Sequence, residues 1–173
     1  MSVPLDQLVR LAKGVQAAVV ARWPEEASPL PARRYITVGA SATTVYDAEQ
    51  FTVSTARAFG HSGDISQETW TPRGVGLWAQ RAVSLDLTVA RKWPIGTTTG
   101  RAQLPPTPDE IESATEMILT DGRALENALL QAIDEDPFLA VPGGRQIAFE
   151  SWQPIGPSGD MAGGMLTVRL QVL

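Results

Sequence analysis

The stretch Ala79–Arg91, AQRAVSLDLTVAR, alternates apolar and polar or small residues along its second half. Four apolar side chains fall on one side of an extended chain: Val83, Leu85, Leu87 and Val89. This period of two indicates a β-strand, because helical spacing would scatter these side chains around the axis. Trp93-Pro94 ends the strand, since proline has no N–H for a ladder. We therefore predict this strand in the middle of a mixed or antiparallel sheet.

The other side of this strand carries Ser84, Asp86 and Thr88. A strand with one apolar and one polar face packs its apolar face on a core and leaves the other face solvated. We expect this polar row to meet water or another protein. These side chains do not form a pattern that indicates catalysis.

The remaining periodic segments surround this strand. Residues 3–22 carry apolar side chains at three- and four-residue steps and predict an amphipathic helix. A second, longer helix is predicted from residue 107 to about residue 133, because Thr107-Pro108-Asp109-Glu110 combines a cap, a first-turn proline and a capping glutamate. Its apolar stripe includes Ile111, and Gly122 on that stripe either permits close approach to the sheet or marks a bend in the helix. Alternation predicts further strands over residues 33–38, 49–59, 145–152 and 165–173.

These elements define an α+β fold with two layers. About five strands form a mixed or antiparallel sheet, and the two helices cover its apolar face. Residues 145–152 and 165–173 are consecutive strands joined by a glycine-rich tip, so we pair them as a hairpin. No composition shift divides the chain, and residues 1–173 are predicted to form a single domain. Two long loops, residues 60–76 and 93–106, flank the central strand; the first is expected to be ordered by a partner.

Composition narrows the classes of function. The chain has no Cys, which excludes disulfides, a thiolate nucleophile and a thiolate metal site. A net charge of −5 argues against a general nucleic-acid-binding surface. No apolar run reaches about 18 residues, so no membrane-spanning segment is expected. The start, MSVPLDQLVR, lacks the features of a signal peptide.

Signals of catalysis and of metal binding are weak. His61 is the only histidine, and its neighbours Ser62 and Asp64 are too close in sequence to converge as a triad. The acidic run Asp134–Asp136 lacks the ligand spacing of a calcium loop. No phosphate-binding loop is present. We therefore predict that the protein is not an enzyme and that it has no catalytic residue, metal or cofactor.

Tryptophan and arginine gather around the two long loops. Both residue types are enriched where proteins meet. The same tryptophans are equally suited to cover the edge of the core. The pattern therefore does not decide between an interface role and a core-covering role. On loop position we predict five residues of a protein interface: Trp70, Arg73, Trp78, Arg91 and Arg101.

The order of segments resembles the tail terminator proteins of long-tailed, siphovirus-like phages. An N-terminal helix and a proline-containing connector precede RRYITVG. A strand-loop-strand unit ends in VSLDLTVARKW, and a long acidic-faced helix leads to a closing hairpin with GGMLTVRLQVL. The resemblance covers nearly the whole chain and lies in arrangement, because this family has no invariant catalytic motif.

The resemblance implies a structural protein of the virion, assembled in the host cytoplasm and located at the head-proximal end of the tail. Such proteins form a homohexameric ring that caps the tail tube, stops its polymerisation and joins it to the head–tail connector. Their partners are the major tail tube protein and the connector, and DNA passes through the lumen without specific binding. Two alternatives remain: another head–tail junction or assembly protein of similar fold, or a small enzyme or ligand-binding domain.

Overall fold

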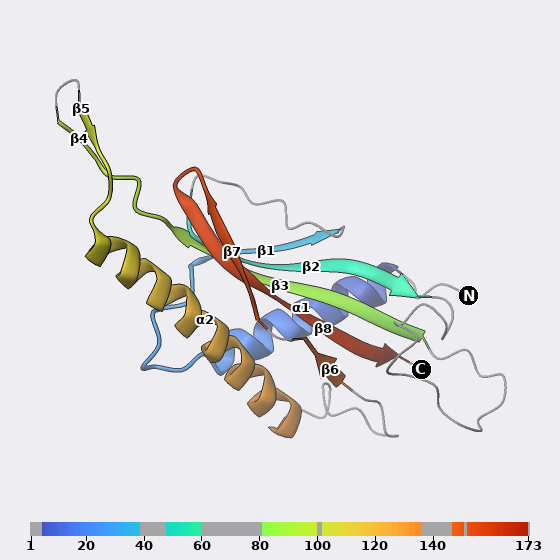
Figure 1. Ribbon diagram of the computed structural model, residues 1–173. Helices are drawn as coiled ribbons and strands as arrows, with labels where there is room; N and C mark the ends of the chain where they lie inside the picture. Colours follow the sequence, from blue (N-terminus) through green and yellow to red (C-terminus); the bar gives the residue numbers. More distant parts are fainter. Residues whose placement is uncertain are drawn as a thin grey trace.

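The computed structural model describes residues 5–38, 48–59, 81–99, 102–135, 147–150 and 152–172. The elements occur in the order α1 (Leu5–Ala21), β1 (Arg33–Val38), β2 (Gln50–Phe59), β3 (Arg81–Lys92), β4 (Thr97–Thr99), β5 (Ala102–Leu104), α2 (Pro108–Glu135), β6 (Ile147–Phe149), β7 (Gln153–Ser158) and β8 (Met161–Val172). Figure 1 shows a twisted sheet with both helices and a small hairpin, β4–β5, that stands away from it.

The main sheet is mixed and has the order β1-β2-β3-β8-β6, with β7 also paired to β8. The β1–β2 pair is parallel and the other pairs are antiparallel. β6 and β7 pair with different parts of β8, residues 168–170 and 161–165, so they follow one another along the same edge. β3 lies at the centre between β2 and β8. These features confirm the predicted mixed α+β sheet and the central position of the Ala79–Arg91 segment.

Both helices pack on one face of the sheet, as predicted. The core consists of residues from α1 and α2 and of strand residues that share one side of the pleat; its sheet members are Phe51, Val53, Leu85, Leu87, Val89, Leu166 and Val168. In these strand residues the period of two places every apolar side chain under a helix. The alternation in the central strand therefore selects the face that the helices cover.

The polar face of β3 is not solvated, and the prediction that it faces water is wrong. Ser84, Asp86 and Thr88 are only 7%, 5% and 3% exposed. Short side chains of a central strand lie between those of both neighbours, and the longer Arg169 and Met165 of β8 stand opposite Ser84 and Thr88. Asp86 Oδ1 accepts a hydrogen bond of 2.8 Å from Thr167 Oγ1. This bond to β8 offsets the cost of burying Asp86, whereas Thr88 Oγ1 is buried without a hydrogen-bond partner.

The N-terminus of α2 has the predicted capping box. The Thr107 N–H donates to Glu110 Oε2 over 2.8 Å, and the Glu110 N–H donates to Thr107 Oγ1 over 3.3 Å. The helix runs to Glu135, two residues beyond the predicted end. Its buried stripe differs from the prediction in that Ile111 is 39% exposed, whereas Asp121, Ala124 and Ala128 are buried as well. The first turns of α2 extend beyond the part of the helix that covers the core.

Two segments predicted as loops contain regular structure. Within residues 93–106, β4 and β5 pair as an antiparallel hairpin. The expected glycine-rich tip before the last strand is replaced by a tight turn, Gly159–Asp160, with Gly159 at a φ of 64°. The hairpin partner of β8 is therefore β7, a strand that was not predicted. β6, within the expected strand 145–152, pairs with β8 as expected, but farther along the same edge.

Several predictions fall on residues 39–47, 60–80 and 136–146 and so lie outside the described residues. They include the long loop 60–76, His61 within it, and the connector after α2.

Candidate protein interface

A projecting arm, defined as residues 93–106, is the most conspicuous surface feature. It contains the β4–β5 hairpin, which stands clear of the sheet and of both helices (Figure 1). Ile95 and Leu104 within it are 54% and 53% exposed. A two-stranded hairpin alone is marginally stable in water, and one that exposes large apolar side chains gains from contact with another surface. The arm therefore has the character of a protein-contact element.

The arm leaves the sheet beside a buried arginine. Arg91 lies on the helix-covered side of β3, one step beyond the apolar row. Its Nε and Nη2 donate to the two carboxylate oxygens of Asp121 on α2, each over 2.8 Å. Nη1 donates to the carbonyl oxygen of Pro29 over 2.9 Å and lies 3.5 Å from Glu49 Oε2. This set, the Arg91 clamp, joins β3 to α2 and to the segments that precede β1 and β2.

Burial makes the clamp a strong constraint. Arg91 is 3% exposed and Asp121 is 1% exposed. Burial alone lowers the pKa of Arg91, but the hydrogen bonds and negative charges of Asp121 and Glu49 outweigh it, and the net shift is upward. A two-point arginine–carboxylate contact also fixes the relative orientation of its partners. The clamp thus holds the end of β3, where the arm begins, against the middle of α2.

Further contacts fix the base of the arm. The Trp93 N–H donates to the carbonyl oxygen of Asp160 in the β7–β8 turn, over 2.6 Å. Gly96 has a φ of 83°, and any side chain there would collide with the Leu104 carbonyl oxygen. Glycine is needed at that point because it adopts this backbone conformation and allows the two chains to approach. These contacts fix the first residues of the arm against the sheet and against its own second strand.

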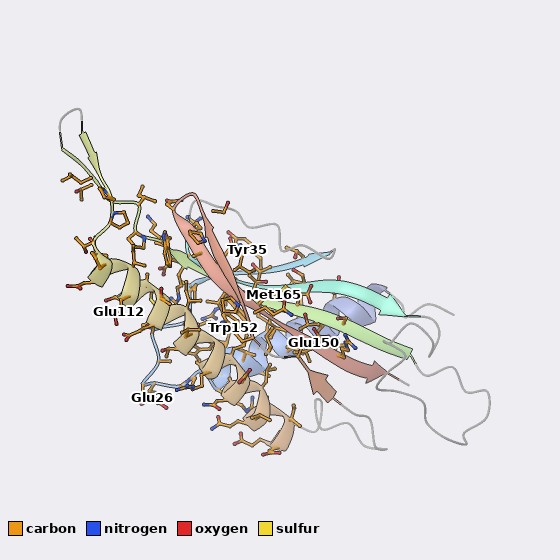
Figure 2. The ribbon with its side chains drawn as sticks, in the orientation of Figure 1. Glu26, Tyr35, Glu112, Glu150, Trp152 and Met165 are labelled. Atoms are coloured by element: carbon orange, nitrogen blue, oxygen red, sulfur yellow. The ribbon has the colours of Figure 1, made fainter. Side chains whose placement is uncertain are left out.

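Trp152 fills the space between α2 and β8 (Figure 2). A Cβ atom added to Gly122 of α2 would lie 2.5 Å from Trp152 Cγ, and one added to Gly164 of β8 would be closer still to the indole. The sheet was the predicted neighbour of Gly122, but the group that lies against it is the Trp152 indole. Trp23 also packs at the edge of the core. Both side chains have the core-covering role.

The five predicted interface residues are not brought together by the described structure. Arg91 is buried, and its hydrogen bonds go to groups of the same chain. Trp70, Arg73, Trp78 and Arg101 lie outside the described residues. An interface that contains the full set stays a prediction.

Sequence reasoning missed the residues that give the arm its properties. Ile95 and Leu104 lie in a segment without periodicity, so no pattern assigned them to a surface. Asp121 did offer a signal, because it stands between Ile118 and Gly122 on the apolar stripe of α2. A carboxylate at such a position requires a buried cation as its partner.

Polar groups on the opposite face of the sheet bond mainly to each other. Thr37 Oγ1 lies 2.7 Å from Ser54 Oγ, and Arg169 forms an ion pair with Glu150. Within the described ranges, no group of three or more His, Cys, Asp or Glu side chains is placed to hold a metal ion. Neither described helix is long and apolar enough to cross a membrane.

Comparisons with known proteins add no assignment to these observations. No protein-family model matches the chain, and a search of curated proteins gives no significant match.

Proposed function

We propose that this protein is a phage tail terminator, which forms a homohexameric ring on the tail tube, stops its polymerisation and offers a docking surface to the head–tail connector. The resemblance in the order of segments motivates the proposal, and the mixed α+β sheet with two helices on one face is compatible with it. The observation that carries it is the arm. A projecting arm that exposes Ile95 and Leu104 and begins beside the buried Arg91 clamp suits a subunit that must reach its neighbours.

The physical requirements of a ring support the same function. A cyclic assembly needs a contact that repeats with a constant rotation, so the contacting element must have a defined direction. The Arg91 clamp and the Trp93–Asp160 hydrogen bond supply that rigidity at the base of the arm. The net charge of −5 is compatible with a channel that lets DNA pass without binding it.

The test combines the full chain with the tail tube protein of the same phage. Light scattering and electron microscopy would measure the ring and the length of the tubes. We expect the wild-type chain to limit tube length and to appear as a ring at one tube end. Ile95→Asp and Leu104→Asp, both at exposed positions of the arm, should fold normally and lose this capping.

Ile155→Asp on β7 is the matched control, since Ile155 is similarly exposed at 47% but lies outside the arm. This variant should cap tubes like the wild type. A wild-type chain that neither associates with tubes nor limits their growth would refute the function. Arm variants that cap normally would refute the role of the arm.

A further inference from the structure

The exposed charges of α2 are almost all negative. The helix has 28 residues and is therefore about 42 Å long. All but one of its exposed or half-buried charged residues are acidic: Asp109, Glu110, Glu112, Glu116, Arg123, Glu126, Asp134 and Glu135. Glu112 lies near the start of the helix, on its solvent-exposed surface (Figure 2). Leu119 and Leu130 are 53% and 48% exposed and lie three helical turns apart on one side. α2 thus presents an acidic face with two apolar side chains within it.

Basic side chains lie on α1 and β1. Arg10 and Lys13 are exposed on α1, where they share an outward line with the exposed Ala17. Arg33 and Arg34 are exposed on β1, the strand at the free end of the sheet order. Across the sequences of these two elements the only acidic residue is Asp6, in the first turn of α1. Consecutive strand residues point to opposite faces of a sheet, and Arg34 is the one that shares the helix-covered side with Phe51 of β2. The basic face is therefore defined by Arg10, Lys13 and Arg34.

The two faces belong to opposite parts of the sheet. α1 packs on β1 and β2, α2 packs on β8, and the two helices lie side by side in contact with each other. The helices meet at an ion pair between Arg22 and Glu135, and the rest of each charged face points outward. Two different surfaces of complementary charge on one subunit are what a head-to-tail contact requires. A twofold contact of α2 against α2 would instead oppose like charges, which costs several kcal/mol.

We propose that copies of this chain associate head to tail, with the acidic face of α2 in one copy against the basic face of α1 and β1 in the next. The occupant of each face is thus a second copy of the same chain. Leu119 and Leu130 anchor the contact, and the surrounding charges fix its polarity and speed the encounter. This interface rests on the ring-forming function proposed above and identifies surfaces that are separate from the arm.

The test is cysteine cross-linking of the full chain, which has no Cys of its own. Lys13→Cys and Glu116→Cys in one chain should form, on mild oxidation with tail tubes present, a disulfide ladder that ends at the ring. Each single variant should give no ladder. A control chain with Gln153→Cys and Glu116→Cys should also give none, because exposed Gln153 of β7 belongs to neither face.

Charge reversal provides the second measurement. Arg10→Glu with Lys13→Glu should weaken self-association by at least roughly tenfold at low salt. Adding Glu112→Lys and Glu116→Lys to the same chain should restore self-association, because the α2 face is then positive and the α1 face negative. Light scattering at low and high salt gives the readout, and far-UV circular dichroism checks folding.

The outcomes separate this interface from the function on which it rests. Rings that form normally in the Arg10→Glu, Lys13→Glu chain, with no ladder from the cysteine pair, would overturn the interface and leave the ring function standing. A wild-type chain that stays monomeric alone and with tail tubes would overturn both. A ladder together with restored association in the exchanged chain would support both.

Discussion

Replacing Asp121 by Asn tests the Arg91 clamp with the smallest change of shape. The amide has nearly the volume of the carboxylate but loses its charge, and one of its two terminal groups becomes a donor facing the guanidinium. Arg91 would then keep its positive charge at 3% exposure without its main partner. The buried cation would be only partly compensated, by Glu49.

The magnitude follows from these contacts. Removing one partner of a buried ion pair costs about 3–5 kcal/mol, because an unpaired charge remains buried. Glu49 offsets part of that cost, yet its side chain is 39% exposed and its oxygen is 3.5 Å from Nη1, so its contribution is screened. We expect Asp121→Asn to lower the free energy of unfolding by about 3 kcal/mol. For a domain of this size the corresponding fall in Tm is roughly 6–12 °C.

Urea denaturation followed by tryptophan fluorescence gives the measurement. Glu135→Gln is the matched control, since it removes an acid from an ion pair with Arg22 in which Glu135 is 65% exposed. Exposed pairs contribute about 0–1 kcal/mol, so this control should stay close to the wild type. Equal losses for Asp121→Asn and Glu135→Gln would refute the reasoning. The double variant Arg91→Met, Asp121→Leu should recover most of the loss, because it removes both buried charges together.

Three further predictions concern α2. Gly122→Ala should destabilise the fold by about 1–3 kcal/mol, because its Cβ would overlap the Trp152 indole; Gly156→Ala, where the added atom meets nothing within 4 Å, should be neutral in the same urea titration. Thr107→Ala should cost about 1 kcal/mol through loss of the capping box, with lower helicity by circular dichroism as the check. The hydrogen bonds from Thr107 lower the pKa of Glu110 from its ordinary value of 4.5. The stability that Glu110 adds is therefore present above pH 4.5 and is lost as pH falls through the lower folded pKa, so the Tm difference between wild type and Glu110→Gln should shrink there; a constant difference would contradict this.

Periodicity and capping chemistry predict the main architecture correctly. Four apolar residues at a period of two identify β3, because in an extended chain that spacing can serve only one face. Thr107 and Glu110 locate the start of α2, since the capping box depends on contacts only three residues apart. Such features depend only on residues that are close in sequence, so they can be predicted from the sequence alone.

Features that depend on distant residues were not predictable in the same way. Burial of Asp86 depends on Thr167, which is 81 residues away. From the sequence, Arg91 is expected to be an exposed arginine at the end of a strand, because nothing local shows that Asp121 is its partner. The arm has the amino-acid composition of a loop. The pairing of β4 with β5 depends on contacts at the base of the arm, such as the close approach of Gly96 to Leu104. Tertiary contacts decide these positions.

The pairing of β3 with β8 has a consequence for how the chain folds. Arg81 lies opposite Val172 and Lys92 opposite Met161, so the central ladder of the sheet joins residues far apart in sequence. Contacts of such separation form slowly, because a long loop must close before they stabilise the fold. During synthesis, β3 waits with one edge unpaired until residues 161–172 have left the ribosome. A nascent chain that stalls before that point exposes an apolar strand edge, which makes the interval before β8 emerges the period of greatest risk of aggregation in the cell.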